Sequence, residues 1–237
     1  LDEIQSVLSK NCVSLDSGSL EKLMEAVAES DDTLLEKYLS EGKLSLEEIT
    51  SGLHKAVDAA KVFPVVFGSA ATDSGIDDLL KAIHDYLASP EEVPNLHVQE
   101  GEVKPLESSP FSAFVFKSIF DPYVGQLSLA RVFSGKLPAN STFYNATQKT
   151  SERFTQLYLL QGKEQRAIEA AGCGDIIALP KLKQTVTTDS LSDQAHPVIF
   201  QPIEFPEAMM SASVKPKTRQ DEEKITQALQ KLVAEDP

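Results

Sequence analysis

Few residues in this sequence have both the side-chain type and the spacing that a catalytic or binding site requires. Lys149 and Arg153, in the stretch NATQKTSERF, are two cations close together in a segment that otherwise favours β-strands. Cationic side chains of this kind bind the phosphate groups of a nucleic acid. The alternative is that both are solvated charges at a strand end. The sequence thus offers Lys149 and Arg153 as candidate phosphate contacts and leaves the solvated interpretation open.

Other reactive patterns are missing from the sequence. It contains no GxxxxGK[ST] phosphate loop, no DxxG and no NKxD, so no known motif cradles phosphates, holds Mg²⁺ or reads a base with a carboxylate. The four histidines are scattered without an acid–base or metal-ligand spacing, and Cys12 and Cys173 show no CxxC pattern. We therefore predict no catalytic residue and no metal site, and we expect both thiols to be buried as small apolar side chains.

The net charge of −14 is distributed unevenly. Residues 1–105 hold 8 basic and 21 acidic side chains, whereas residues 106–195 hold 9 basic and 8 acidic ones. The middle of the chain can therefore approach a phosphate backbone without strong repulsion. The sequence contains neither an apolar run of membrane-spanning length nor a leader peptide, so we expect a cytoplasmic protein without membrane contact.

The first 90 residues predict helices around one buried strand. The stretch 31–42 ends at Gly42, a residue typical of the position after a helix, and the stretch 45–57 opens with the capping box of Ser45 and Glu48. The apolar run VFPVVFGSA, at 62–70, predicts a fully buried strand of a parallel sheet. A helix with an apolar stripe follows over 72–87, with Asp73 or Ser74 as its cap. This is one unit of an α/β domain whose sheet needs further strands.

The middle of the chain predicts an all-β domain. The stretch 88–110 has four prolines and no apolar period, which indicates a linker over residues 91–110. Six or more short strands separated by turn residues then predict a closed barrel or sandwich over residues 111–195.

One hairpin of that domain can be predicted in detail. Asp121, Pro122 and Gly125, in DPYVG, suit a turn between two strands. Beyond the turn the apolar positions move out of step at Leu129 and Ala130, which predicts a β-bulge or bend.

The last segment, residues 196–237, changes class again. The stretch EAMMSASVKPKT predicts a strand that ends at Pro216, and the residues from Thr218 onward predict a helix capped by that threonine. One strand and one helix cannot bury a core, so we expect a third domain that is incomplete here.

Four stretches resemble bacterial elongation factor G in the order of that family. They are EAVAESDDTLLEKYLSEG, VFPVVFGSAATDSGIDDLLKAIHDYLASP, FKSIFDPYVGQLSLARVFSGKL and KPKTRQDEEKITQALQKLVAEDP. The resemblance implies the C-terminal piece of a G domain over residues 1–90, the antiparallel β-barrel of domain II over 111–195, and the start of the ferredoxin-like α+β domain III over 196–237. Because the chain begins at Leu1, we expect an internal fragment of the family's ribosomal translocase GTPase. The stretch LLQGKEQRAIEA departs from the family pattern and suggests a divergent paralogue.

The resemblance also implies a site and partners. The family's guanine-binding GSA element falls on Gly68, Ser69 and Ala70, followed by Ala71, and a turn after a buried strand exposes backbone N–H groups that can donate to guanine. The parent protein would bind GTP or GDP with Mg²⁺, while this fragment is expected to bind no cofactor and to be inactive. Its expected partners are the ribosome and small-subunit rRNA, and we expect a monomer.

Two other functions compete with translocation. Release factors, ribosome-protection proteins and recycling factors are related translational GTPases with the same domain order, and the sequence leaves them open. An autonomous metabolic enzyme would need a nucleophile or an acid–base pair in a cleft, and the sequence offers no such set.

Overall fold

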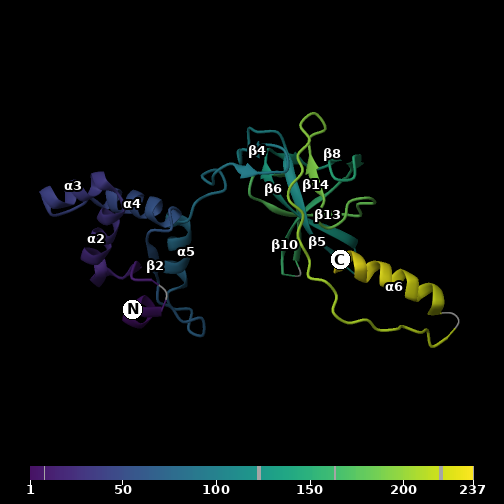
Figure 1. The fold of residues 1–237 in the computed structure, drawn as a ribbon, viewed down its shortest axis with the longest axis horizontal. Coiled ribbons are helices and arrows are strands. Elements are labelled where there is room, and N and C mark those ends of the chain that lie inside the picture. Colours follow the sequence, from purple (N-terminus) through teal and green to yellow (C-terminus); the bar gives the residue numbers. More distant parts are fainter. Residues whose placement is uncertain (8, 122–123, 163, 219–220, 237) are drawn as a thin grey trace. The chain divides into compact units, whose positions relative to one another are not determined.

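The structure is a computed structural model that describes residues 1–7, 9–121, 124–162, 164–218 and 221–236. The chain divides into two compact units, Leu1–Ser89 and Pro90–Pro237 (Figure 1). Each unit has its own cluster of buried apolar side chains.

The first unit consists of helices around a short parallel ladder. Its elements in chain order are α1 (Asp2–Val7), β1 (Cys12–Ser14), the 3₁₀ turn η1 (Ser17–Ser19), α2 (Leu20–Ser30), α3 (Asp32–Glu41), α4 (Leu46–Asp58), β2 (Phe63–Val65) and α5 (Ile76–Tyr86). Strands β1 and β2 pair in parallel, from Cys12 with Phe63 to Ser14 with Val65. The core gathers around Val27 and Leu53, which are fully buried.

Local sequence rules place two of these helix ends. Ser45 caps α4 with a complete capping box, in which the Ser45 Oγ accepts from the Glu48 N–H and the Glu48 Oε2 accepts from the Ser45 N–H at 2.9 Å. Gly42 follows α3 in the left-handed conformation, with φ of 72°. The predicted cap of α5 is wrong, because Gly75 occupies that position with φ of 75°.

The apolar surface of this unit is less buried than the sequence pattern predicts. Phe63 in β2 is 43% exposed, and large side chains are exposed at Leu79, Leu80 and Ile83 of α5 and at Leu87, which follows it. A parallel strand is buried only when both faces of its sheet are covered. Within the described residues this sheet has two strands, so the prediction of a fully buried strand is wrong.

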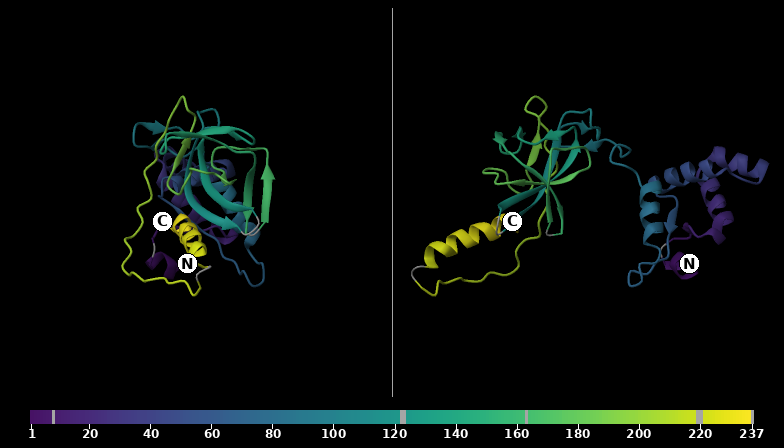
Figure 2. Two further views of the ribbon diagram at one scale, coloured as in Figure 1. Left: turned by 90° about the vertical axis from the view of Figure 1, so that its right-hand side faces the viewer. Right: turned by 180° about the vertical axis from the view of Figure 1, so that it is seen from behind.

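The second unit is a strongly curved antiparallel sheet. Its strands are β3 (Leu96–His97), β4 (Glu102–Val103), β5 (Ser112–Asp121), β6 (Gly125–Ser134), β7 (Leu137–Pro138), β8 (Thr142–Asn145), β9 (Thr150–Arg153), β10 (Leu157–Gln161), β11 (Glu164–Ile168), β12 (Ala170–Ala171), β13 (Ile176–Pro180) and β14 (Ser190–Ser192). Eight of them form one sheet in the order β11-β10-β13-β6-β5-β14-β8-β9. The strands curl around a shared apolar core (Figure 2).

A second ladder bridges the two ends of this sheet. Strands β7 and β12 pair with each other, and the Ala139 N–H donates to the Glu169 carbonyl at 2.7 Å. Nearby, the Asn140 N–H donates to the Thr155 carbonyl at 3.1 Å. These bonds connect the segment after β7 with the residues that follow β9 and β11. The predicted antiparallel barrel is confirmed.

The hairpin of β5 and β6 contains the predicted bulge. Val115 pairs with Ala130 and Lys117 with Leu129, so the ladder skips one residue of β5 where the apolar pattern of β6 changes face. The turn is fixed by Asp121, whose Oδ1 accepts from the Val124 N–H at 2.8 Å. Gly125 has φ of 91°, as the turn chemistry predicts, whereas Pro122 lies outside the described residues.

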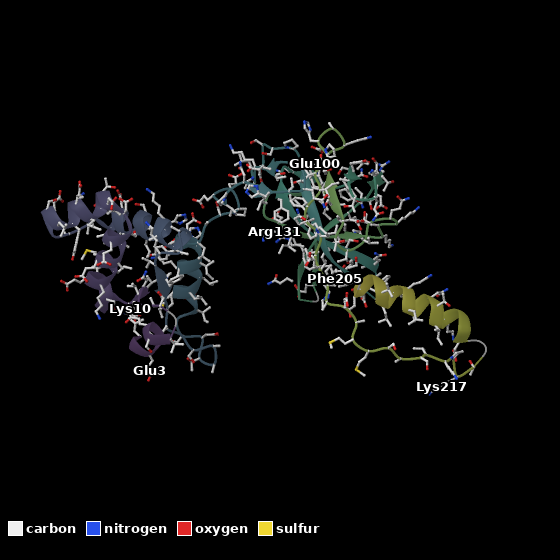
Figure 3. The ribbon with its side chains drawn as sticks, viewed as in Figure 1. Glu3, Lys10, Glu100, Arg131, Phe205 and Lys217 are labelled. Carbon is white, nitrogen blue, oxygen red and sulfur yellow. The ribbon has the colours of Figure 1, made fainter. Side chains whose placement is uncertain are left out.

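The last segment forms one helix and no further sheet in its described part. The strand expected before Pro216 is not formed, and the segment from Phe205 to Lys217 is extended and exposed (Figure 3). A strand needs a neighbour for its backbone groups, and the described chain supplies none here. Helix α6 (Glu222–Glu235) follows, and Asp221, not Thr218 as predicted, occupies its N-cap position without a side-chain capping bond. Its Glu235 Oε1 accepts from the Phe120 N–H of β5 at 2.6 Å.

Candidate functional site

A hollow of about 350 Å³ lies where several strands of the barrel end. Strand β9 ends at Arg153, β10 begins at Leu157 and β13 ends at Pro180. We call it the cationic hollow and define it by its lining residues, Val124, Arg153, Phe154, Thr155, Gln156, Tyr158, Pro180 and Lys181. It carries two cations and no acidic side chain among these residues.

The structure separates the two predicted phosphate-binding residues. Arg153 lines the cationic hollow, whereas Lys149 lies outside its lining, in the turn between β8 and β9 with φ of 55°. Sequence reasoning missed Lys181, which the barrel places beside the same hollow. The sequence does place Lys181 directly after the strand-like stretch GDIIALP, which could have marked it as a cation at a strand end. Its nearness to Arg153, however, depends on strand pairing.

The side chains of the cationic hollow leave donors available to a ligand. The Arg153 Nη2 donates to the Asn140 Oδ1 at 3.3 Å, which uses one of the five N–H groups of a guanidinium. The Lys181 backbone N–H donates to the Gln126 carbonyl at 2.8 Å, so the backbone at this cation is fixed. The lining combines two cations with the aromatic side chain of Tyr158, and these are the residue types that bind a nucleic-acid phosphate and stack a base.

A buried carboxylate organises the loop that carries Lys181. The Glu152 Oε1 accepts from the Lys183 N–H at 2.8 Å and from the Gln184 N–H at 3.0 Å. Its Oε2 accepts from the Thr185 N–H at 3.0 Å and from the Thr185 hydroxyl at 2.5 Å. Burial raises the pKa of Glu152, but these hydrogen bonds outweigh the burial and hold the pKa below its ordinary value.

A second buried carboxylate anchors the far end of the same loop. The Asp189 Oδ2 accepts from the Asn145 side-chain amide and from the Val186 N–H, both at 2.8 Å. Its Oδ1 accepts from the Gln148 side-chain amide at 3.0 Å. Asn145 also donates to the Thr185 hydroxyl at 3.1 Å, so the two anchors share one network. The loop between β13 and β14 is therefore held in one conformation by β8 and β9.

The predicted guanine-binding turn lies in the first unit, directly after β2. The Ser69 N–H donates to the Ser74 carbonyl at 2.8 Å, so this N–H is already used within the turn. Ala70 and Ala71 are exposed at the tip of the turn. The turn is tight because a Cβ at Gly75 would lie 2.4 Å from the Phe67 carbonyl oxygen. A hollow of about 540 Å³ adjoins the turn and is lined in part by Phe67, Asp78 and Lys81.

Among the described residues, no group of three or more histidine, cysteine, aspartate or glutamate side chains could hold a metal. No helix in the described ranges is both long enough and apolar enough to cross a bilayer. Cys12 is buried, Cys173 is half-buried and donates to the Phe133 carbonyl at 3.0 Å, and both are free thiols.

Comparisons with known proteins relate the second unit to one family. Elongation factor G domain 2 matches residues 110–194, and Elongation Factor G, domain III, matches residues 205–237. A crystal structure of a protein from Thermus thermophilus is similar, with a TM-score of 0.74, 29% identity and coverage of 93% of this chain. The chain spans 32% of that protein's chain. Two domains of one family match in succession, so residues 110–194 and 205–237 belong to elongation factor G domains, and a solved structure matches nearly the whole chain.

Proposed function

We propose that the chain is part of a ribosomal translocase GTPase and that its barrel docks on small-subunit rRNA. The observation that carries the proposal is the cationic hollow, which lies within the segment matched by elongation factor G domain 2. Arg153 and Lys181 would contact phosphates, with Lys149 as a further contact on the β8–β9 turn. The alternative parent proteins are release, ribosome-protection and recycling factors, which would dock through the same barrel.

The first unit would supply one side of a guanine nucleotide site. Ser69, Ala70 and Ala71 would hold the base of GTP or GDP, and the exposure of Ala70 and Ala71 at the turn supports this role. In the parent protein, GTP bound with Mg²⁺ would supply the free energy for translocation on the ribosome. The phosphates and the metal would be held by other parts of the parent, since this sequence has no phosphate loop.

The domain III residues would relay the nucleotide state to the rest of the parent protein. The hydrogen bond between Glu235 of α6 and the Phe120 N–H of β5 supports a direct path from the barrel to this helix. Lys231 of the same helix lies over the Phe120 ring, 5.7 Å from its centroid. In this proposal the chain works in the cytoplasm as a monomer.

The docking proposal is tested by measuring binding of the purified chain to small ribosomal subunits at several salt concentrations. We expect Lys149→Ala/Arg153→Ala to weaken binding and to reduce the slope of log K against log salt by about two phosphate contacts. The matched control is Lys10→Ala/Lys43→Ala, which removes the same charge from exposed positions of the first unit.

The control should keep the wild-type slope, because its lysines belong to the other unit. An unchanged slope in Lys149→Ala/Arg153→Ala would contradict the assignment of these two residues. Absence of binding by the wild-type chain at low salt would contradict the docking function itself.

A further inference from the structure

Glu152 occupies an unusual place for an acidic residue. It lies on β9, an edge strand of the main sheet, between the exposed residues Ser151 and Arg153, yet it is only 9% exposed. Its carboxylate points inward and accepts from three successive backbone N–H groups, those of residues 183 to 185. Successive N–H groups that converge in this way form an anion-binding concavity. Here the anion is a side chain of the protein itself.

The loop that Glu152 holds is the one that carries the cations. Residues 181 to 189 connect β13 to β14. Lys181 at the start of this connection lines the cationic hollow, and Lys183 is exposed two residues later. Lys181 has φ of 57°, a conformation that is uncommon for a residue with a side chain. Bonds on both sides hold it, since the Lys181 N–H donates to Gln126 and the three N–H groups beyond Leu182 donate to Glu152.

The inward carboxylate also affects the charge of the surface. Glu152 is the only acidic side chain in residues 149–158 and 180–184, which contain four basic ones. An outward carboxylate beside Arg153 would neutralise that cation and repel phosphate. By facing the loop backbone, Glu152 removes this charge from the surface and uses it to fix the loop.

We propose that Glu152 is a positioning residue for RNA binding, which holds the β13–β14 loop so that Lys181 lies beside Arg153 at the cationic hollow. The inference rests on the proposed docking function and names a residue that supports it without touching the RNA. For a variant that neutralises Glu152, the positioning role and simple electrostatics predict opposite changes in RNA affinity. Removing a negative charge strengthens binding to RNA in general, whereas loss of a positioning residue weakens it.

The experiment measures binding of Glu152→Gln to purified small ribosomal subunits beside the wild-type chain. The glutamine amide would present N–H donors to backbone donors, so the loop should loosen. We expect affinity to fall by about threefold to tenfold and the salt slope to decrease by about one contact, that of Lys181. The charge-matched control is Glu164→Gln on β11, an exposed residue, which should bind as well as the wild type or better.

A double-mutant cycle separates positioning from general damage to the barrel. If Glu152 acts through Lys181, then Glu152→Gln/Lys181→Ala should bind no more weakly than Lys181→Ala alone. Amide hydrogen exchange should speed up at residues 183 to 185 in Glu152→Gln and remain slow in the β5–β6 ladder, which shows that the barrel is folded.

Each outcome has a defined meaning. Wild-type affinity in Glu152→Gln, or losses that add fully in the double variant, would overturn the positioning role alone. A wild-type chain that does not bind small subunits would overturn the docking function and this inference with it. Reduced affinity with a smaller salt slope and non-additive losses would support the inference.

Discussion

Asn145→Ala should be among the most damaging single substitutions in the barrel. Asn145 is fully buried, and its side-chain amide donates to the Asp189 Oδ2 at 2.8 Å and to the Thr185 hydroxyl at 3.1 Å. Its Oδ1 accepts from the Gln148 N–H at 3.0 Å. Removing a bond to a buried charge costs about 1.5–3 kcal/mol, and removing the neutral bond to the buried Thr185 hydroxyl costs about 1 kcal/mol more. Since Asp189 keeps its other donors, we expect a loss of about 3–4 kcal/mol.

The assay is urea unfolding followed by NMR signals of barrel residues, which reports on this unit alone. With a slope of about 2 kcal/mol per M urea, the midpoint should fall by about 1.5–2 M. Gln161→Ala, at an exposed position of β10, is the control and should change stability by less than about 0.5 kcal/mol. A loss below about 1 kcal/mol in Asn145→Ala would refute the argument that this buried network holds the loop between β13 and β14.

Two further predictions concern the first unit. The hydrogen bond from Lys37, with those from the Ser45 N–H and hydroxyl, lowers the pKa of Glu48 from 4.5 to about 2. The capping box of α4 should therefore be intact above pH 4.5 and be lost as the pH falls toward 2, and the Ser45 amide shift measured by NMR should follow that window. Because the sequence lacks the phosphate loop, NKxD and DxxG, calorimetric titration of the chain with GTP or GDP should show no micromolar binding. A micromolar affinity would mean that the turn at Ser69 and its surroundings form a nucleotide site by themselves.

Local patterns predicted those elements whose signals lie within a few residues. The capping box at Ser45, the left-handed Gly42 and the change of apolar face at Ala130 each identify a feature that the structure contains. Elements that depend on distant partners were predicted less well. The segment before Pro216 has strand-forming residues but no neighbouring strand within the described ranges, and three large apolar side chains of α5, Leu79, Leu80 and Ile83, remain exposed.

The residues of the candidate site were likewise predictable only where they did not depend on distant partners. Arg153 could be selected from its own sequence context, but Lys181 could not, because its nearness to Arg153 depends on the closure of the barrel. The inward direction of Glu152 was also hidden, since a glutamate beside an arginine on an edge strand normally faces water.

The sequence by itself indicated the family and the order of an α/β piece and a β-barrel, and it offered Lys149 and Arg153 as candidate phosphate contacts. Only the tertiary structure decided which cations share a surface and which carboxylate is turned inward to hold them. The physical reason is the separation in sequence between the residues that interact. Caps, turns and bulges are set by bonds between near neighbours, whereas the bonds of Glu152 to residues 183–185 exist only after the strands have paired.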